Sequence, residues 1–173
     1  MADPSKIREI TERNAKTLAL KPTRGHLTAV TKARMVDGLR CEIEEGSWKL
    51  AADMPIKAGG EDTAPTPGML GRGALASCLA IGISMWAARL GVPLDALEVE
   101  VQADFDARGQ LGVGDHIPPG YREVRYVVSI DSPASAQAVA ELLDTAERHS
   151  PYVDVFARAQ TMKRVLRLNG KEA

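Results

Sequence analysis

The stretch that decides the fold is residues 66–91, TPGMLGRGALASCLAIGISMWAARLG. Thr66 is suited to cap a helix, Pro67 fits the first helical position, and Gly91 fits the left-handed conformation at a helix end. These signals predict one long helix over residues 67–90. The middle of the segment carries no charge, and a helix that is apolar on every side is typical of the interior of a fold.

Small residues line two faces of this predicted helix. One face carries Gly71, Ala74, Cys78, Gly82 and Met85, and a second carries Gly73, Ala76, Ala80, Ser84 and Ala87. An interior glycine costs a helix about 1 kcal/mol relative to alanine, so a stable helix with three of them requires the space that they leave. We therefore expect another backbone segment to pack closely against this helix near Cys78.

Strand patterns and turns flank the central helix on both sides. The expected elements are a helix over 3–18, strands within 26–54 with a turn at Asp37–Gly38, a loop at 57–67, strands over 97–105 and 122–130, a helix over 134–149, a short element after Pro151 and a strand over 161–168. This order predicts an α+β fold. We expect one domain, residues 1–173, with an N-terminal helical arm (1–20) and a core (21–173).

The composition argues against several classes of function. The chain has 173 residues, 45% of them hydrophobic, and 22 Lys and Arg nearly balance 23 Asp and Glu, which gives a net charge of −1. Nucleic-acid binding favours a clustered basic surface, which this balance does not suggest. The first residues lack the apolar segment of a secretory signal, and a membrane span needs about 20 predominantly apolar residues. We expect a cytoplasmic protein that binds neither nucleic acid nor membrane.

Cys78 is the residue that carries a specific chemical hypothesis. A reactive thiol needs a nearby cation or a helix N-terminus. Cys78 lies about three turns into its helix, so an arginine from elsewhere would have to supply the charge. The alternative is a buried, unreactive cysteine.

Other chemistry finds little support in the sequence. His26, His116 and His149 lack metal-ligand spacing, so we expect no metal and no cofactor. A hydrolase combination of Cys78, His149 and Asp154 has no local motif behind it.

The central stretch resembles the OsmC/Ohr family of osmotically induced and peroxide-detoxifying bacterial proteins. The matching text is GGEDTAPTPGMLGRGALASCLAIGISMWAARLGVPLDALEVEV, residues 59–101, and AERHSPYVDVF, residues 146–156. The resemblance extends over roughly residues 26–168. It implies an OsmC-like fold, with a curved antiparallel sheet around a long central helix, in an intertwined homodimer whose two long helices cross.

The resemblance also implies reduction of organic hydroperoxides. In the family a peroxidatic cysteine is oxidised, a second cysteine resolves it, and an arginine and a glutamate activate the thiolate. Cys78 matches the peroxidatic position, Ser150 stands where the resolving cysteine would be, and Gly68 stands where the glutamate would be. Arg34 and Arg40, on the N-terminal strands, are the two candidates for the arginine.

Two functions remain open at this point. A serine cannot form the disulfide that protects a sulfenic acid, and the spacing does not place Cys41 near Cys78 as a substitute. One hypothesis is a single-cysteine hydroperoxide reductase that uses an external thiol, with Ser150 bonded to the sulfur. In the other, the homodimer has lost catalysis and binds a small apolar ligand at its interface. The residues expected to line such a pocket are Leu79, Met85, Trp86 and Tyr152. Ser150 has a simpler role as well, as the cap of the helix that starts at Pro151.

Overall fold

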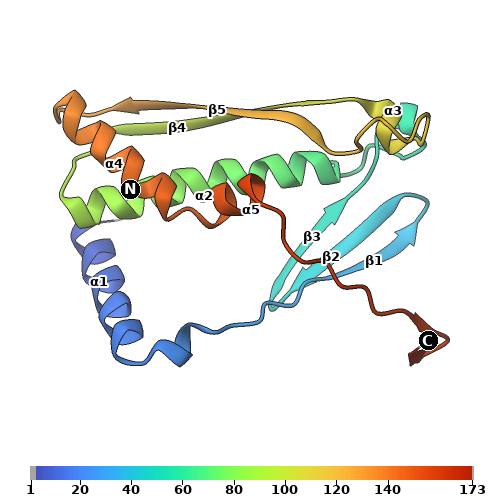
Figure 1. The fold of residues 1–173 in the computed structure, drawn as a ribbon, viewed down its shortest axis with the longest axis horizontal. Helices are drawn as coiled ribbons and strands as arrows, with labels where there is room; N and C mark the ends of the chain where they lie inside the picture. The colour runs from blue at the N-terminus through green and yellow to red at the C-terminus, as the bar shows by residue number, and fades with distance from the viewer. Residues whose placement is uncertain (1–2, 173) are drawn as a thin grey trace.

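The computed structural model describes residues 3–172 and has an α+β fold, as the sequence predicts (Figure 1). The helices are α1 (Pro4–Leu20), α2 (Pro67–Leu90), α3 (Ala107–Gln110), α4 (Ala136–Arg148) and α5 (Pro151–Ala157), with single 3-10 turns η1 (Pro22–Gly25) and η2 (Ile56–Ala58). The strands are β1 (Lys32–Asp37), β2 (Arg40–Glu45), β3 (Trp48–Ala52), β4 (Ala96–Phe105), β5 (Tyr121–Asp131), β6 (Arg167–Leu168) and β7 (Lys171–Glu172). Neighbouring strands pair antiparallel, in three separate sheets: β1–β2–β3, β4–β5 and β6–β7.

The central helix α2 begins and ends where its capping residues predict. The Thr66 side chain accepts a hydrogen bond from the amide of Met69, and Pro67 occupies the first turn. At the other end Gly91 has a φ of 72°, and its amide donates to the carbonyl of Ala87. Glycine adopts this left-handed conformation without a steric penalty, so the helix stops there.

The core lies between α2, α4 and the β4–β5 ribbon. Ile83 and Ala87 of α2 pack against Leu142 and Ala146 of α4, and all four are buried. The ribbon runs along α2, with alternate residues half-buried on the side that faces the helix (Figure 1). This period-2 alternation is what a two-stranded ribbon with one covered face requires.

The β1–β2–β3 sheet stands apart from α4 and α5 and is largely uncovered (Figure 1). All six residues of β1 are exposed, and large apolar side chains remain open on this sheet, among them Met35 and Leu50. Trp48 of β3 is 77% exposed. The β1–β2–β3 sheet is thus a part of the fold on which large apolar side chains are left open to solvent.

Two strand predictions differ from the structure. The first strand begins only at Lys32, because Lys32 already pairs with Glu44 near the end of β2 and the preceding residues run past that strand. The strand predicted over 161–168 is reduced to its last two residues, β6, which pair with β7 just beyond the predicted range. A segment with strand-like composition does not form a strand without a neighbour to hydrogen-bond.

Helix α2 is, within residues 3–172, the one helix whose length and composition would allow it to cross a membrane. The central helix of a soluble protein meets the same criteria. Here α2 contacts α1, α4, α5 and β4. This packing is that of a core helix and fits a soluble protein.

Candidate functional site

Cys78 and Ser150 meet in the structure although 72 positions separate them in the sequence. Their Sγ and Oγ atoms are 3.8 Å apart, where the middle of α2 passes the start of α5. Ser150 is only 6% exposed. The structure therefore places a buried hydroxyl against the sulfur.

The hydroxyl of Ser150 is oriented by its position at the start of α5. Its Oγ accepts a hydrogen bond from the amide of Val153, which makes it the cap of that helix. Since the oxygen accepts this bond, its own proton is left to be donated elsewhere. The sulfur of Cys78, 3.8 Å away, is within reach of that proton.

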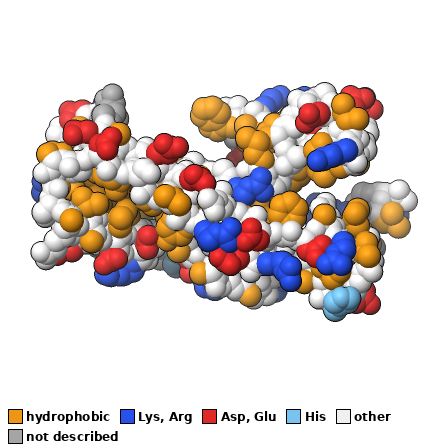
Figure 2. Space-filling view, turned by 90° about the horizontal axis from the view of Figure 1, so that it is seen from above, with side chains coloured by type: hydrophobic (Ala, Val, Ile, Leu, Met, Phe, Trp, Pro, Cys, Tyr) orange, Lys and Arg blue, Asp and Glu red, His pale blue; other side chains and the backbone are white. Residues whose placement is uncertain are grey.

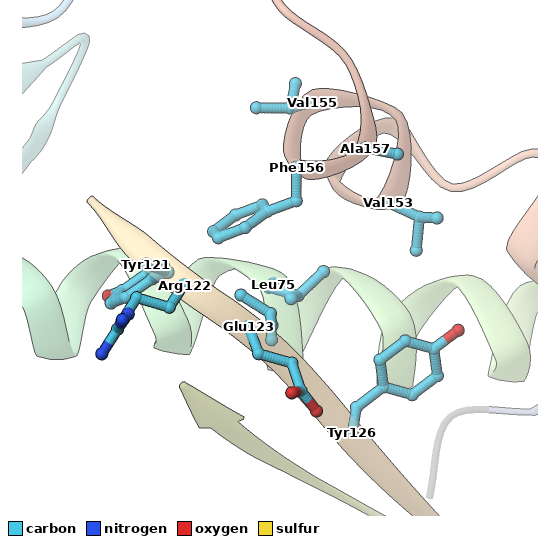
Figure 3. A pocket seen from close by; sticks show the side chains of 10 residues that line it. Leu75, Tyr121, Arg122, Glu123, Tyr126, Val153, Val155, Phe156 and Ala157 are labelled. Atoms are coloured by element: carbon cyan, nitrogen blue, oxygen red, sulfur yellow. The ribbon is translucent and has the colours of Figure 1, made fainter. Parts of the chain in front are cut away.

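A cavity of about 590 Å³ opens one helical turn from this pair, between α2, β5 and α5 (Figure 3). Leu75, one turn before Cys78, and Val153, one turn after the start of α5, lie on its wall. Tyr121 and Phe156 stack at its side with ring centroids 6.3 Å apart. The cavity suits an apolar body of moderate size.

The polar side chains that line this cavity are two tyrosines, an arginine and a glutamate: Tyr121, Arg122, Glu123 and Tyr126 (Figure 3). Burial, and then the neighbouring carboxylate of Glu147, raise the pKa of Tyr126, so its phenol stays protonated. The Tyr121 hydroxyl donates to the carbonyl of Gly68 (3.2 Å) and accepts from Nη1 of Arg72 (3.3 Å). The cavity therefore combines an apolar wall with hydroxyl groups and one charged side chain of each sign.

Gly68, in the first turn of α2, lies next to the guanidinium of Arg72. A Cβ atom built at this position would lie 3.4 Å from Nη1 of Arg72. The family resemblance places a carboxylate here, and glycine supplies none. The N-terminal turn of α2 therefore offers no side chain that could hold an arginine from the strands.

Neither candidate arginine touches the Cys78–Ser150 pair within residues 3–172. Arg34 of β1 pairs with Glu42 on the adjacent strand, at 2.9 Å, and is 74% exposed. Arg40 of β2 donates from Nη1 to the side-chain oxygen of Thr63 at 2.7 Å. Both lie on the sheet that stands apart from the middle of α2 (Figure 1).

The remaining predicted residues are placed elsewhere. Cys41 lies on β2, with its sulfur 3.8 Å from the carbonyl of Glu42. His149 stacks on Trp86, and Asp154 pairs with Arg158, so the hydrolase combination with Cys78 is not assembled.

The four residues expected to line a ligand pocket are not among those around the 590 Å³ cavity. Leu79 is buried in the core instead. Over residues 3–172 the structure contains no group of three His, Cys, Asp or Glu side chains that could hold a metal ion.

Asp53 is a buried charge that the sequence does not single out. Its carboxylate is 1% exposed and accepts hydrogen bonds from the amides of Met54, Glu61 and Thr63 and from the hydroxyl of Thr63. The two bonds from Thr63, ahead of the others, lower its pKa to about 2. The only signal in the sequence is an acidic residue directly after an apolar strand, followed by a Gly-Gly loop.

Gly60 completes this loop because it has no side chain. A Cβ atom there would lie 2.0 Å from the carbonyl oxygen of Met54 and 2.8 Å from the Asp53 carboxylate. The loop that leads into α2 is thus folded tightly around one buried charge.

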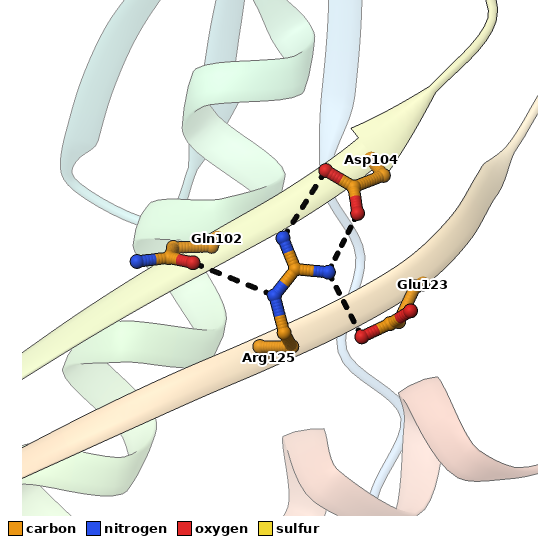
Figure 4. A network of polar contacts seen from close by, with 4 residues as sticks. All are labelled: Gln102, Asp104, Glu123 and Arg125. Atoms are coloured by element: carbon orange, nitrogen blue, oxygen red, sulfur yellow. Dashed lines mark hydrogen bonds and ion pairs between the residues drawn. The ribbon is translucent and has the colours of Figure 1, made fainter.

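A second polar network lies on the exposed side of the β4–β5 ribbon (Figure 4). Arg125 contacts Asp104 across the ribbon at 2.5 Å and Glu123 on its own strand at 2.8 Å. The bond from Arg125 lowers the pKa of Asp104. The network ties the two strands together on the surface and takes no part in the site around Cys78.

The chain was compared with protein-family models, with curated proteins and with solved structures. The model of a family described as OsmC-like protein matches residues 59–163. No curated protein matches the chain.

Solved structures with the same fold share little sequence with the chain. An OsmC-like protein from Mycoplasma pneumoniae is 16% identical, with 76% of this chain and 88% of that chain covered and a TM-score of 0.65. An organic hydroperoxide resistance protein OsmC from Legionella pneumophila is 22% identical (75% and 89% covered, TM-score 0.53). An organic hydroperoxide resistance protein from Elizabethkingia anophelis, with thiocyanate bound, is 16% identical (75% and 88% covered, TM-score 0.56).

Proposed function

The chain belongs to the OsmC-like protein family, and from this premise we propose that it reduces organic hydroperoxides through the single thiol of Cys78. The observation that carries the proposal is the 3.8 Å contact between Cys78 Sγ and the buried hydroxyl of Ser150, next to an apolar cavity. The names of the Legionella and Elizabethkingia proteins, which are hydroperoxide resistance proteins, support the same activity. We place this activity in the cytoplasm, as part of a stress response.

The first step transfers one oxygen atom to sulfur. The Cys78 thiolate attacks the terminal oxygen of the hydroperoxide, the O–O bond breaks, and the leaving alkoxide takes up a proton to become an alcohol. The sulfur is left as a sulfenic acid, which has gained the oxygen that the substrate lost. The Ser150 hydroxyl stabilises the thiolate before the attack.

An external thiol completes the cycle because serine has no sulfur to offer. One thiol condenses with the sulfenic acid, releases water and leaves a mixed disulfide on Cys78. A second thiol then attacks this disulfide, which restores the Cys78 thiol and releases the oxidised reductant. The two thiols supply the two electrons that the hydroperoxide consumed.

We also infer that the working form is a homodimer. One face of α2 is exposed along its whole length, and its residues are Met69, Gly73, Ser77, Ile81 and Met85. Ile81 is 60% exposed, and hydrophobic side chains are open on the surface (Figure 2). A second copy would cover this face and could bring its own β1–β2–β3 sheet, with the arginines, to Cys78.

Hydroperoxide turnover tests the activity. Purified protein is incubated with cumene hydroperoxide and dithiothreitol, and peroxide consumption is compared among the wild type, Cys78→Ser and Cys41→Ser. We expect Cys78→Ser to fall to the rate without protein and Cys41→Ser to retain turnover. Equal rates for the wild type and Cys78→Ser would contradict the proposal.

A second function is favoured by the same cavity. Gly68 and Ser150 both replace catalytic groups of the family, and the 590 Å³ cavity has a mainly apolar wall, so the dimer could bind a small apolar ligand without turnover. Native mass spectrometry for a co-purifying molecule, and melting temperatures across a panel of lipids and metabolites, test this alternative. No bound molecule and no shift in melting temperature would count against it.

A further inference from the structure

The corner between α4 and α5 is attached to α2 at two points. Ser150 lies on Cys78, with 3.8 Å between the two side-chain atoms, and the residue before it, His149, stacks on Trp86. The imidazole and indole ring centroids are 4.9 Å apart, and the two rings are inclined by 25°. Trp86 lies about two turns beyond Cys78 on α2. Two adjacent residues of the corner therefore contact one helix at separate places.

The indole of Trp86 is a fixed platform for this stack. Trp86 is half-buried and packs against the core cluster that α2 and α4 share. The guanidinium carbon of Arg89, one turn further along α2, lies 4.2 Å from the centroid of the indole. A guanidinium over an aromatic face is attracted to it. The ring that receives His149 is thus held by its own helix and by the core.

The helix that follows the corner has little burial of its own. None of the residues of α5 is buried, and the chain after it, residues 158–166, forms neither helix nor strand. Near the end of α5, Phe156 stacks on Tyr121 with ring centroids 6.3 Å apart. At its start, next to Ser150, the ring contact comes from His149. One aromatic contact thus fixes each end of α5.

His149 and Ser150 are coupled through a tightly closed turn of backbone. The amide of His149 donates to the carbonyl of Ala146 at 3.3 Å, and the amide of Ser150 donates to the carbonyl of Glu147 at 3.1 Å. The carbonyl of Ser150 in turn accepts from the amide of Asp154 at 3.1 Å. A displacement of the His149 ring is therefore passed on to the neighbouring hydroxyl.

We propose that His149 is a positioning residue for Ser150, and that its ring, stacked on Trp86, keeps the Ser150 hydroxyl against the sulfur of Cys78. The inference rests on the proposed function, in which that hydroxyl stabilises the thiolate. Misplacement of an oriented group by about 1 Å can cost on the order of 100-fold in rate. A residue that fixes the corner therefore affects the reaction although it acts only through its neighbour.

The test measures how firmly the fold holds two thiols together at these positions. In a background of Cys41→Ser and Ser150→Cys, the chain carries Cys78 and the introduced thiol. The protein is equilibrated with reduced and oxidised glutathione, and mass spectrometry measures the fraction of disulfide. Formation of this disulfide oxidises the two thiols and converts one oxidised glutathione into two reduced molecules. The equilibrium constant reports how well the corner keeps the two positions in contact.

Three variants are compared in this background. His149→Gln keeps a polar side chain but removes the ring, whereas His149→Phe keeps a ring but removes its nitrogen atoms. Arg148→Gln is the matched control at the same end of α4, since Arg148 is exposed and forms no ion pair within residues 3–172. The side chain of His149 is also exposed, so we expect the variants to fold. Melting curves check this, and His149→Ala replaces the glutamine variant should that one not fold.

We expect His149→Gln to lower the equilibrium constant about fivefold, which is the order of effect that one aromatic contact supplies. His149→Phe and Arg148→Gln should stay within about twofold of the background. An unchanged constant for His149→Gln would overturn the inference. An equally large fall for His149→Phe or for Arg148→Gln would also overturn it, because the effect would then not come from the ring. A background that forms no disulfide would contradict the contact itself and the inference with it.

Turnover tests whether His149 acts through Ser150. In the chain that retains Ser150, His149→Gln should lower the turnover of cumene hydroperoxide. Combined with Ser150→Ala, it should lower turnover no further than Ser150→Ala does alone, because two residues that act through one contact are not additive. Unchanged turnover for His149→Gln, or a further loss in the combined variant, would overturn the positioning role.

The proposed function fails in a different way from this inference. If cumene hydroperoxide turnover does not depend on Cys78, the proposed function is wrong, whatever the disulfide measurement shows, since that measurement uses no peroxide. If turnover depends on Cys78 but loss of the His149 ring leaves the equilibrium constant unchanged, the activity stands and the role of His149 is overturned.

Discussion

Ser150 serves the backbone and the sulfur at the same time. Its oxygen accepts from the Val153 amide and caps α5, and its proton remains available for Cys78. A cap of this kind contributes about 1 kcal/mol to stability. The presence of serine at this position is therefore explained structurally even before any chemistry is considered.

Replacing this hydroxyl by a thiol should convert the site into a two-cysteine site. In Ser150→Cys the two sulfur atoms start near the present 3.8 Å separation, and a small side-chain rotation brings them to the about 2.05 Å of a disulfide. We expect cumene hydroperoxide to produce a disulfide between Cys78 and the introduced thiol, which peptide mass spectrometry detects without reduction. Ser150→Ala is the control, and persistent free thiols in the Ser150→Cys variant would show that the two side chains do not meet.

Asp53 should make the stability of the fold depend on pH in the acid range. Its pKa of about 2 in the folded chain lies below the ordinary value of 3.8, so the unfolded chain binds the proton more tightly. The contribution is fully present above about pH 5 and is lost as the pH falls toward 2. Urea unfolding midpoints from pH 2 to 6 should fall more steeply for the wild type than for Asp53→Asn, and parallel curves would contradict this.

At the scale of elements, α2 shows what a sequence can and cannot predict. The bounds of the helix follow from Thr66, Pro67 and Gly91, because capping depends on local backbone geometry. The buried face does not follow, since every face of the helix is apolar. In the structure Ile83 lies in the core and Ile81, two positions away, is exposed.

The strands and the loop before α2 show two further limits of sequence reasoning. Residues 161–166 are part of a predicted strand but have no neighbouring strand to pair with in the described part of the chain. Asp53 escapes detection because three of its partners are backbone amides, which leave no side-chain pattern. The resemblance to a family did place positions 78 and 150 together, since it carries long-range information that composition and periodicity lack.

Truncation of the buried face of α2 should destabilise the fold. Ile83 has no exposed surface and packs on Leu142 of α4, so Ile83→Ala should lower the free energy of unfolding by about 2–5 kcal/mol. Leu111→Ala removes a mostly exposed side chain and should change it by less than about 0.5 kcal/mol. Equilibrium urea denaturation of both variants provides the comparison, and similar losses would show that α2 is not packed as described.

At the scale of the whole molecule, one chain leaves two apolar surfaces uncovered. The exposed face of α2 and the β1–β2–β3 sheet both carry large hydrophobic side chains, such as Ile81 and Leu50. Burial of apolar area contributes roughly 25 cal/mol per Å², so covering both surfaces together gives a strong driving force for association. The same association would bring the arginines of the partner's β1–β2–β3 sheet to Cys78. The proposed activity would then depend on dimer formation.

A charge on the open face of α2 should weaken the dimer. Ile81→Asp would bury a carboxylate without a partner in the proposed interface, which is costly. We expect sedimentation equilibrium to give a dimer for the wild type and a mostly monomeric chain for Ile81→Asp, while Leu111→Asp stays dimeric. A monomeric wild type at micromolar concentration would remove the basis for the homodimer.

The open position of Trp48 gives the chain an intrinsic optical reporter. Its indole is 77% exposed on the sheet, whereas Trp86 is half-buried and stacked on His149. Fluorescence emission from Trp48 should shift to shorter wavelength on concentration, as a second copy excludes solvent from the indole, while Trp86 should report only loss of the folded core. Trp48 fluorescence thus reports dimer formation, and Trp86 fluorescence reports unfolding of the core.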